Sequence, residues 1–524
     1  MQGLTNKIMS QKLDNFKEII SHSKEYGYVF PSSEIYDGLA AVYDYGPYGV
    51  ELKKNIRDYW WKAMVEINDD VVGLDAAIFM NPKTWKASGH VDNFNDPMID
   101  NKDSKKRYRA DVLIEDHIEK YRQKIEKDVA KGKKKFGDSF DEEQFRATNP
   151  NVIRNQAKIE EIESRFEASM GQGNLASVKQ LIEDLGIACP ESGSKNWTDV
   201  RQFNLMFSTQ LGSVADDSGT LYLRPETAQG IFVNFLNVQK SSRRKVPFGI
   251  AQTGKAFRNE IVARQFLFRM KEFEQMEMQF FVRPGTEMEW YEHWKQKRIN
   301  WHKSLGIPQD KYRFHDHVSL AHYANAAVDI EFDFPIGFKE VEGIHSRTDF
   351  DLKAHEEVSG RKLRYFDPEI NESYVPYVVE TSIGLDRMFL VVLSNSFEVE
   401  QLEQDGKTSE RTVLKIPPIL APVKLAILPL VKKDGLDEKA MEIFNDLRYE
   451  FACQYDEKDA IGRRYRRQDA IGTPYCITVD YDTLEDNSIT VRYRDSMEQK
   501  RVKIDELKNE MRNELDVSKL LRNL

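Results

Sequence analysis

Two arginines stand on either side of a short stretch near the middle of the chain. The first lies in Phe257-Arg258-Asn259-Glu260, and the second begins Arg269-Met-Lys-Glu-Phe273. A fixed guanidinium group can hold developing negative charge with two hydrogen bonds, and its shape suits phosphate oxygens. This spacing therefore indicates chemistry at a phosphate group. The alternative is a pair of surface strands joined by ordinary salt bridges.

A second nucleotide-binding pattern, just before these arginines, is incomplete. Gly249-Ile-Ala-Gln-Thr-Gly254-Lys255-Ala256 nearly matches a phosphate-binding P-loop. That motif needs Ser or Thr after the lysine because the hydroxyl group binds Mg²⁺, and Ala256 has no hydroxyl. A P-loop also leads into a helix, whereas we expect this segment to continue as a strand. We therefore exclude a P-loop.

The two arginine segments resemble motif 2 of class II aminoacyl-tRNA synthetases, in which a loop joins two antiparallel strands. The resemblance implies that Arg258 binds the α-phosphate of ATP and the amino-acid carboxylate. It also implies that Arg269 reaches the terminal phosphates and that Phe273 stacks on adenine. The implied ATP-binding set also includes Asn259, Glu260, Glu340 and Arg387.

A later segment, Val379-Glu380-Thr381-Ser382-Ile383-Gly384-Leu385-Asp386-Arg387, resembles motif 3 of the same enzymes and leads into an apolar helix at residues 388–393. It implies that Arg387 binds the γ-phosphate, the alternative being a capping contact at the helix start. The implied catalytic residues are therefore Arg258, Glu260 and Arg387.

Motif 1 has a weaker match in Tyr43-Asp-Tyr-Gly46-Pro47-Tyr-Gly49-Val and the helix after it, which implies a homodimer. No HIGH-type sequence is present, and Lys102-Asp-Ser-Lys-Lys106 matches the class I lysine loop poorly. We therefore reject class I.

Three more segments narrow the family. They are Leu223-Arg224-Pro225-Glu226-Thr227-Ala228-Gln229-Gly230, Glu272-Phe-Glu-Gln-Met-Glu277 and the stretch from Glu340-Val-Glu342-Gly343 to Asp351. In this order they are similar to the bacterial, homodimeric type of glycyl-tRNA synthetase, and the resemblance covers nearly the whole chain outside one insertion. The implied glycine-binding residues are Glu226, Glu277 and Glu380 around the ammonium group, Arg347 near the carboxylate, and Ser382.

The implied site agrees with the chemistry of glycine. Glycine has no side chain to hold, so affinity must come from its two charges, and selectivity must come from leaving no room at the α-carbon. Each carboxylate alone could equally be a surface or strand-face charge. A cluster of acids in one place, however, needs a cation.

The composition indicates folded domains. The chain has 524 residues, of which 40% are hydrophobic and 31% charged, with a net charge of −10. This excludes a uniformly basic nucleic-acid coat and leaves room for a local basic face. We expect four parts: a catalytic core with motif 1 at 1–98, a charged, partly helical insertion at 99–197, the core with motifs 2 and 3 at 198–415, and an anticodon-binding domain at 416–524.

The hydrophobic pattern predicts an α+β fold, a class II antiparallel sheet flanked by helices, with a helical insertion and a C-terminal α/β domain. Helices are expected at 13–23, 50–67, 115–130 and 152–169, with a lysine-rich break at 132–137. Short strands are expected at 221–223, 249–251, 266–268, 276–282, 329–334 and 377–380. After prolines at 417, 418 and 422, we expect strands at 425–430, 475–479 and 488–493 and a helix at 437–451.

The C-terminal segment from Ala460 to Pro474 resembles the anticodon-binding domain shared by glycyl, histidyl, prolyl and threonyl enzymes. Four arginines around a tyrosine can meet phosphates and stack on an unpaired base. The alternative is a solvated loop. The implied tRNA-binding residues are Arg463, Arg464, Tyr465, Arg466 and Arg467.

The three cysteines are too few and too scattered for a disulfide framework, which indicates a reducing compartment. Many bacterial relatives carry two Cys-x-x-Cys pairs in the insertion, suggestive of a zinc ribbon. The matching stretches here, Asp100-Asn101-Lys-Asp-Ser104 and Cys189-Pro-Glu-Ser192, keep one cysteine. We therefore expect no zinc and an insertion held by apolar packing or helix pairing. It is either a solvated helical hairpin or a tRNA-contacting element.

The expected activity is a glycine–tRNA ligase that uses ATP and Mg²⁺, forms glycyl-adenylate, and transfers glycine to the 3′ end of its tRNA. No signal peptide or apolar stretch of about 18 residues occurs, so we expect a cytoplasmic protein without a membrane segment. One alternative is a class II enzyme for proline or threonine. Another is a non-catalytic synthetase-like tRNA-binding protein, which we would expect to lack Arg258, Glu260 or Arg387.

Overall fold

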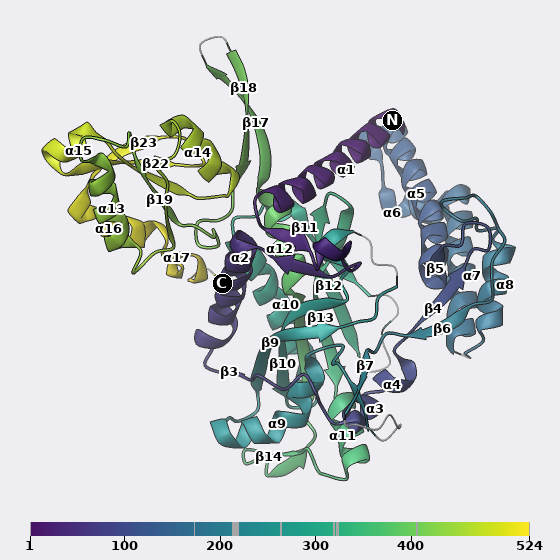
Figure 1. The fold of residues 1–524 in the computed structure, drawn as a ribbon. Helices are drawn as coiled ribbons and strands as arrows, with labels where there is room; N and C mark the ends of the chain where they lie inside the picture. Colours follow the sequence, from purple (N-terminus) through teal and green to yellow (C-terminus); the bar gives the residue numbers. More distant parts are fainter. Residues whose placement is uncertain are drawn as a thin grey trace. The chain divides into compact units, whose positions relative to one another are not determined.

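A computed structural model describes residues 2–171, 173–211, 219–261, 265–317, 320, 324–404, 407–522 and 524 (Figure 1). The chain divides into two compact units. The first comprises Met1–Ser88, Phe207–Arg258 and Ala263–Leu524, and the second comprises Gly89–Met206 and Asn259–Val262. Among the described helices, none is long and apolar enough to cross a membrane.

The first unit is built on a seven-stranded sheet (Figure 1). Its pairs are antiparallel except for β3 and β9, which run parallel at one edge. In spatial order the strands are β11 (Tyr312–Asp316), β12 (Ala326–Phe334), β13 (Gly337–Thr348), β16 (Tyr377–Gly384), β10 (Glu272–Val282), β9 (Phe248–Phe257) and β3 (Val71–Gly73).

Strand β10 shows why the sheet has two different faces. Its sequence alternates polar Gln275, Glu277 and Gln279 with apolar Met276 and Met278. Successive strand residues point to opposite faces, so one face is polar and the other apolar. The apolar members are fully buried in the main core. We call the opposite face, which carries Glu277 and Gln279, the active face.

Helices cover the apolar face and one end of the active face. The main core joins β10 and β12 to α2 (Pro47–Trp61), α10 (Glu287–Ser304) and α12 (Leu385–Ser396). A separate cluster packs α9 (Ala228–Ser242) and α11 (Phe350–Ser359) against Ile250, Phe281 and Val378. The remaining polar part of the active face lies next to this second cluster.

The first unit has further helices and strands outside the seven-stranded sheet and its covering helices. They are α1 (Gln2–Glu25), β1 (Val29–Pro31), β2 (Tyr43–Tyr45), α3 (Pro82–Ala87), β7 (Ser208–Gln210), β8 (Thr220–Tyr222), β14 (Tyr365–Asp367), β15 (Glu372–Tyr374) and the hairpin of β17 (Phe397–Gln404) and β18 (Lys407–Leu414). The hairpin follows α12 directly.

The C-terminal segment, also in the first unit, is an α/β fold with its own core. Its sheet has the order β20 (Cys453–Tyr455), β19 (Leu425–Pro429), β21 (Tyr475–Val479), β22 (Ser488–Tyr493) and β23 (Gln499–Lys503). Its helices are α13 (Leu436–Leu447), α14 (Ile461–Ala470), α15 (Tyr481–Asp486), α16 (Ile504–Glu514) and α17 (Ser518–Leu521).

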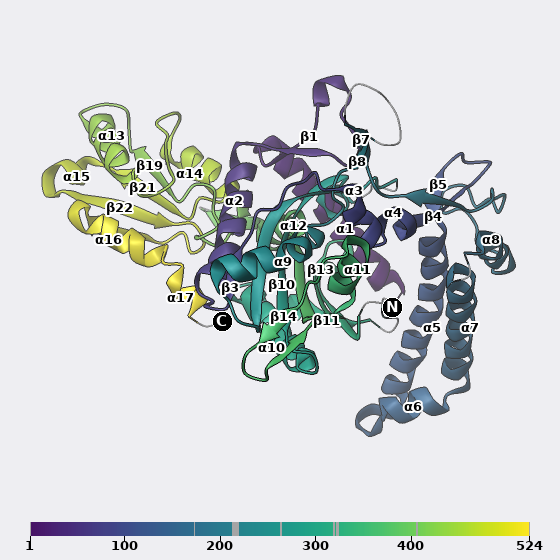
Figure 2. The ribbon, with the colours of Figure 1, turned by 90° about the horizontal axis from the view of Figure 1, so that it is seen from below.

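The second unit pairs two long helices, α5 (Ala110–Phe136) and α7 (Pro150–Gly171), which lie side by side in Figure 2. Buried Leu113, Ile118, Ile162 and Leu181 belong to the apolar cluster that joins these helices to α8 (Leu175–Asp184). The unit is completed by α4 (His90–Asn93), α6 (Glu142–Thr148) and a sheet of β5 (Arg107–Arg109), β4 (Asn95–Asp100) and β6 (Arg201–Asn204). Apolar packing of paired helices thus holds this insertion, as predicted.

Three sequence predictions about elements are wrong. Residues 132–137 do not break the helix, because α5 continues to Phe136 and Gly132 lets the rings of Phe140 and Phe145 pack closely. Residues 266–268 form a buried 3₁₀ turn, η5 (Phe266–Phe268), because a short apolar run does not distinguish a strand from a turn. The helix expected to reach residue 451 ends at Leu447. The exclusion of a P-loop is confirmed, since residues 249–256 lie within β9.

Candidate active site

Strand register places three of the five predicted glycine-binding residues, Glu277, Glu380 and Ser382, in adjacent rows across the active face. Glu277 of β10 lies opposite Ser382 of β16, and Ser382 lies opposite Gly343 of β13. In the next row, Gln279 lies opposite Glu380. Because these rows are two residues apart, their side chains share one face. The sheet therefore brings together side chains more than 100 residues apart in the chain.

Two buried carboxylates form the centre of this site. Glu277 is 2% exposed and Glu380 is 4% exposed. Gln279 Nε2 donates to both, to Glu277 Oε1 at 2.8 Å and to Glu380 Oε2 at 2.6 Å. The Thr227 hydroxyl group donates to Glu277 Oε2. Two acids buried this close together form a site for a cationic group.

A layer of ion pairs holds Glu380 in place. Arg347 Nη1 donates to Glu380 Oε2 at 3.1 Å and, through Nε and Nη2, binds Asp351 in a bidentate pair. His345 Nδ1 lies 2.7 Å from Glu380 Oε1. Glu226 accepts a 2.9 Å hydrogen bond from Gln229, which also donates to Asp351. Four of the five predicted glycine-binding residues, Glu226, Arg347, Glu380 and Glu277, thus belong to one continuous chain of hydrogen bonds and ion pairs.

Ser382 is linked to Glu277 through Gln275 and Thr227. Its hydroxyl group accepts from Gln275 Nε2 at 3.1 Å, and Gln275 Oε1 accepts from the Thr227 backbone at 3.2 Å. Thr227 in turn binds Glu277. Ser382 therefore belongs to the hydrogen-bonded set around the two carboxylates.

Arg258, just after β9, has its side chain held by contacts that include a backbone carbonyl and an aromatic ring. Its Nε donates to the carbonyl oxygen of Pro225 at 3.1 Å, and its guanidinium carbon lies 5.2 Å from the centre of the Phe273 ring. Phe273 is on the active face, because it has the same strand parity as Gln275 and Glu277. The structure therefore places the Arg258 guanidinium group over the Phe273 ring.

Arg387 and Glu340 form a second pair. Arg387 Nη1 lies 3.0 Å from Glu340 Oε2, and its guanidinium group lies 4.5 Å from the Phe268 ring centre. Arg387 lowers the pKa of the Glu340 carboxyl group. Asp386, the residue before Arg387 in α12, accepts hydrogen bonds from Glu274 N at 2.7 Å and from Lys53 of α2 at 2.8 Å. These buried contacts fix the start of α12, which presents Arg387.

The remaining motif 2 residues lie in different surroundings. Arg269 follows η5 directly and is partly buried. Asn259 and Glu260 group with the second unit, where Asn259 N donates to the Leu205 carbonyl at 2.8 Å. The structure thus brings Arg258 and Phe273 together, and it groups Asn259 and Glu260 with the insertion.

Sequence reasoning missed several residues that complete the site. Gln279, Gln252 and Thr227 are fully buried around the carboxylates, and Gln252 lies opposite Glu277. Gln252 Nε2 has no hydrogen-bond partner in the structure. For Gln279, the alternation of polar residues along β10 was the available signal. Gln252 lies in the segment that resembles a P-loop, and that pattern gives no sign of a place beside Glu277.

Comparisons with known proteins agree with this arrangement. Three family models match: glycyl-tRNA synthetase insertion domain 1 at residues 96–205, the tRNA synthetase class II core domain (G, H, P, S and T) at 209–396, and an anticodon binding domain at 424–514. A glycine–tRNA ligase of Chlorobaculum tepidum is 52% identical over 487 residues, covering 93% of this chain and 97% of that protein. The chain belongs to the glycine–tRNA ligase family.

Other glycine–tRNA ligases match almost as well. The enzyme of Staphylococcus haemolyticus is 51% identical over 498 residues, covering 94% of this chain and 97% of that protein. A structure of Giardia lamblia prolyl-tRNA synthetase with prolyl-adenylate has a TM-score of 0.58 at 14% identity, covering 98% of this chain and 81% of that chain. At that identity the likeness shows the fold, and it confirms the predicted class II architecture.

The arginine cluster of this glycine–tRNA ligase family member lies on α14. Arg464 is buried and donates to the carbonyl oxygens of Pro429, Leu430 and Asp456. Arg467 pairs with Asp456 at 2.6 Å, and the Tyr465 hydroxyl group bonds Thr478. These three side chains are engaged within the protein. The prediction of tRNA contact therefore rests mainly on exposed Arg463 and half-buried Arg466.

The four positions that match the cysteines of a zinc ribbon are Asn101, Ser104, Cys189 and Ser192. Hydrogen bonds bring them together. Cys189 Sγ lies 3.4 Å from Ser104 Oγ and 3.2 Å from the Tyr108 hydroxyl oxygen. Asn101 Oδ1 accepts from Ser104 N and from the Ser192 hydroxyl group. Burial raises the pKa of the Cys189 thiol, but hydrogen bonds from Ser104, Ser192 and Tyr108 outweigh it and lower that pKa to about 6.

We expect Cys189→Ser to leave the insertion folded. A serine hydroxyl group can keep these hydrogen bonds, so the loss should be about 1 kcal/mol. A metal-held ribbon would instead unfold when a ligand is lost. Denaturant unfolding of wild type and variant, each with and without a chelator, measures this. Unfolding of the insertion in the variant, or by chelator alone, would contradict the expectation.

The two central carboxyl groups have opposite pKa shifts. Burial, with Glu380 and Glu226 adding to it, raises the pKa of Glu277 well above its usual value. Burial also raises the pKa of Glu380, but Arg347 and His345 outweigh it and lower that pKa to about 2. In the absence of a cation, Glu277 therefore binds a proton at a higher pH than an ordinary glutamate does.

We expect glycine binding to release a proton from Glu277. A raised pKa keeps the carboxyl group protonated at pH values well above about 4.3, where free glutamate ionises, and an arriving ammonium group favours the ionised form. Apparent affinity for glycine should therefore rise with pH until Glu277 ionises by itself. Calorimetry of glycine binding in two buffers with different ionisation enthalpies measures the number of protons released on binding. Glu277→Gln should abolish its release, and equal heats for the wild type in both buffers would contradict the assignment.

Proposed function

We propose that this glycine–tRNA ligase family member forms glycyl-adenylate on the active face, with Glu277 and Glu380 as the ammonium site. The observation that supports this most strongly is the pair of buried carboxylates joined by Gln279, on the same face as Phe273. Glu226, which accepts a hydrogen bond from Gln229, would add a third negative charge. Arg347 would hold Glu380, and its proposed reach toward the glycine carboxylate remains a prediction.

In the first step, a carboxylate oxygen of glycine attacks the α-phosphorus of ATP, and the bond to the pyrophosphate leaving group breaks. Arg258 would stabilise the charge at the α-phosphate, and Arg387 would stabilise the charge on the leaving group. Phe273 would stack on adenine, and Arg269 would contact the terminal phosphates. Asn259 and Glu260 are proposed to bind ATP as well. No general base is required, because the attacking carboxylate is already ionised.

In the second step, the terminal 3′-hydroxyl group of tRNA attacks the carbonyl carbon of the adenylate, and AMP leaves. Positioning of the two substrates would supply most of the rate. Residues 416–524, with exposed Arg463 and half-buried Arg466 of α14, are proposed to contact the anticodon end. The insertion is proposed either to contact tRNA or to be a solvated helical hairpin.

Class II tRNA synthetases use ATP with a divalent metal ion, and we propose Mg²⁺. It would neutralise phosphate charge when bound with ATP. Glu340 fits such an ion, because its carboxylate is 46% exposed beside Arg387 and offers the oxygen ligands that Mg²⁺ prefers. For the insertion, we propose that no structural zinc is needed.

We also propose a homodimer in the cytoplasm, with the four-part division 1–98, 99–197, 198–415 and 416–524. Ile35 and Tyr36 of η1 (Glu34–Tyr36) are 87% and 79% exposed, an apolar surface that a second copy would cover. Sedimentation of the wild type and of Ile35→Ser tests the dimer. A wild-type monomer at working concentrations would contradict it.

ATP–pyrophosphate exchange with each of the twenty amino acids tests the activity. We expect strong exchange with glycine and almost none with alanine, since every competitor of glycine adds atoms at the α-carbon. A binding pocket rejects an amino acid poorly when that amino acid is smaller than the correct substrate. Because no amino acid is smaller than glycine, we expect no editing activity. Exchange driven by proline or threonine would support the alternative enzymes.

Glu277→Gln separates charge from size in this test. It removes a charge partner of the ammonium group at nearly constant volume, so glycine exchange should fall while alanine stays excluded. Rapid hydrolysis of alanyl-tRNA for glycine by the pure wild type, or substantial alanine exchange, would contradict this account of selectivity.

A further inference from the structure

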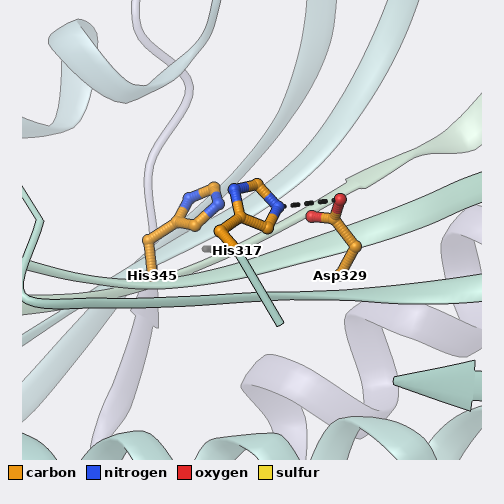
Figure 3. Close-up of side chains that lie close together, drawn as sticks. All are labelled: His317, Asp329 and His345. Carbon is orange, nitrogen blue, oxygen red and sulfur yellow. Dashed lines mark ion pairs between the residues drawn. The ribbon is translucent and has the colours of Figure 1, made fainter. Parts of the chain in front are cut away.

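Three side chains that are not proposed to contact glycine or ATP lie together beside the active face. They are His317, just after β11, Asp329 of β12 and His345 of β13, and one ligand atom of each lies within 4.8 Å of the others. Figure 3 shows the two imidazole rings side by side, with the Asp329 carboxylate facing His317. His317 Nε2 lies 2.9 Å from Asp329 Oδ2.

The strand register produces this cluster. Asp329 lies opposite Gly343, and His345 stands two residues further along β13, so both side chains point to the active face. Strand β11 ends at Asp316, but His317 N still donates to the Ala327 carbonyl at 3.1 Å. The pairing therefore continues for one more residue and brings His317 beside the other two.

His345 is oriented with one ring nitrogen toward the cluster. Its Nδ1 is engaged by Glu380 at 2.7 Å, which leaves Nε2 as the nitrogen that can bind another group. A carboxylate on the far nitrogen of a ligating histidine fixes the ring and its tautomer in many metal sites. Glu380 binds the far nitrogen of His345 in the same way.

Gly343 keeps space open at the cluster. A β-carbon there would lie 3.2 Å from His345 Nε2, 3.0 Å from His345 Cε1 and 3.7 Å from Asp329 Oδ1. Any larger side chain would extend further into this space. The glycine therefore leaves room next to two of the three ligand atoms.

We propose that His317, Asp329 and His345 bind a divalent first-row transition-metal ion, with Zn²⁺ as the best-suited ion. Two imidazoles and one carboxylate are the protein ligands of many open zinc sites, in which water takes the fourth position. Bonds of about 2.1 Å in a tetrahedron place ligand atoms about 3.4 Å apart, so atoms already within 4.8 Å need only small side-chain movements. Mg²⁺ prefers oxygen ligands and fits this set poorly.

The site is accessible and separate from the zinc-ribbon positions. The side chains of His317, His345 and Asp329 are 34%, 21% and 14% exposed, so an ion can enter from solvent. The sheet forms the site without the metal, and the ion would therefore be exchangeable and not required for folding. The competing interpretation is two unrelated ion pairs, His317 with Asp329 and His345 with Glu380.

Binding of Co²⁺ to the full-length protein distinguishes these interpretations. Co²⁺ replaces Zn²⁺ and reports its ligands by absorption. The Cys189→Ser background removes the insertion thiol, excess Mg²⁺ fills oxygen-only sites, and ATP and glycine are omitted. We expect one Co²⁺ per chain, visible d–d bands without a thiolate charge-transfer band, and displacement by Zn²⁺.

Variants locate the ion. His317→Ala and the nearly isosteric Asp329→Asn should each weaken binding by about tenfold or more, while His293→Ala on α10 serves as the matched histidine control and should bind normally. Circular dichroism checks that each variant is folded, and His317→Gln replaces His317→Ala if that variant is not. Unchanged Co²⁺ binding in folded His317 and Asp329 variants, or no stoichiometric binding by the wild type, would overturn the proposal. Because no substrate is present, the result does not depend on the proposed activity.

Discussion

Arg258→Ala and Arg387→Ala should each lower glycine-dependent ATP–pyrophosphate exchange by about a hundredfold or more, corresponding to roughly 3 kcal/mol of lost transition-state stabilisation. Both guanidinium groups are fixed before substrate arrives. Arg258 is held by the Pro225 carbonyl and Phe273, and Arg387 is held by Glu340 and Phe268. Fixed donors stabilise charge without reorganising during the reaction, so their loss should reduce the rate more than it reduces glycine binding.

A matched control separates this effect from a general loss of positive charge. Arg283, just after β10, is 38% exposed and pairs with Asp367 at 2.6 Å, away from the two carboxylates. Arg283→Ala should leave exchange near the wild-type rate. Arg258→Lys should remain strongly impaired, because an ammonium group cannot form the two parallel hydrogen bonds of a guanidinium group. Near-normal exchange in both alanine variants would show that the motif assignments are incorrect.

The alternation of polar and apolar residues along β10 can be seen in the sequence. It explains why sequence and structure agree on which β10 side chains lie at the centre of the site. A period of two puts Phe273, Gln275, Glu277 and Gln279 on one face whatever the surrounding fold. The partner strands could be placed only through the family resemblance. Local pattern alone does not reveal that Glu380 lies opposite Gln279.

Two irregularities of β13 could not be predicted. In the pairing with β12, the register runs from Ile330–Glu342 to Glu331–Glu340 and skips Val341. In the pairing with β16, it runs from Ser346–Val379 to Thr348–Val378 and skips Arg347. Such bulges change which face a side chain points to. The first lets both Glu340 and Gly343 face the site, although their spacing of three would put them on opposite faces of a regular strand.

The arginine cluster shows a different limit of sequence reasoning. Arg463, Arg464, Arg466 and Arg467 look equivalent as sequence, yet Arg464 is buried among backbone carbonyl oxygens. Whether an arginine binds RNA or holds its own domain depends on which carbonyl groups and carboxylates the fold leaves nearby. Asp469, two residues after Arg467, is the clearest example, because it lies at the centre of a buried network.

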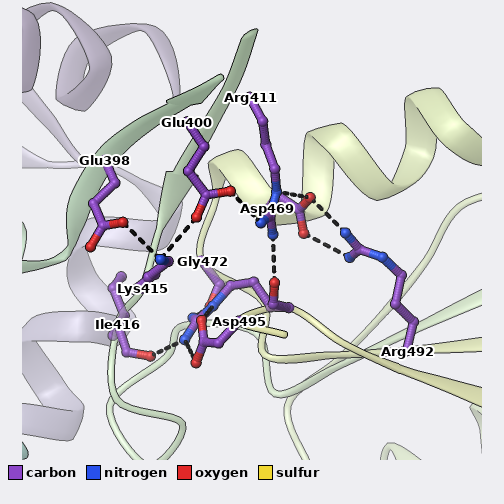
Figure 4. A network of polar contacts seen from close by, with 10 residues as sticks. Glu398, Glu400, Arg411, Lys415, Ile416, Asp469, Gly472, Arg492 and Asp495 are labelled. Atoms are coloured by element: carbon purple, nitrogen blue, oxygen red, sulfur yellow. Dashed lines mark hydrogen bonds and ion pairs between the residues drawn. The ribbon is translucent and has the colours of Figure 1, made fainter. Parts of the chain in front are cut away.

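Asp469→Asn should destabilise the C-terminal segment by about 3–5 kcal/mol, the usual cost of breaking a buried ion pair. Asp469 and Arg411 are both fully buried and pair at 2.8 Å, and Arg492 binds Asp469 through two more hydrogen bonds (Figure 4). Asparagine keeps the shape but loses the charge. Two buried guanidinium groups would then lose the charge of Asp469, and Glu400, which pairs with Arg411 at 2.8 Å, is already paired with Lys415 at 2.9 Å.

The same network joins the C-terminal segment to the hairpin that follows α12. Arg411 of β18 donates to the Arg494 carbonyl oxygen at 2.6 Å, and Arg494 donates to the Ile416 and Gly472 carbonyl oxygens. Loss of Asp469 should therefore loosen the C-terminal segment while the active face, which lies in the seven-stranded sheet, stays intact. We expect tRNA charging to fall much more than glycine-dependent exchange.

Denaturant unfolding followed by probes in the C-terminal segment measures the loss of stability, with exchange and charging assayed in parallel. Asp495→Asn is the matched control, since Asp495 pairs with Arg494 at 2.7 Å but is 56% exposed, and an exposed pair contributes about 1 kcal/mol or less. If the two variants lose stability equally, burial does not determine the strength of this network. If exchange and charging fall together in a folded Asp469→Asn protein, the C-terminal segment supports adenylate formation directly, and the proposed separation of the two functions is incorrect.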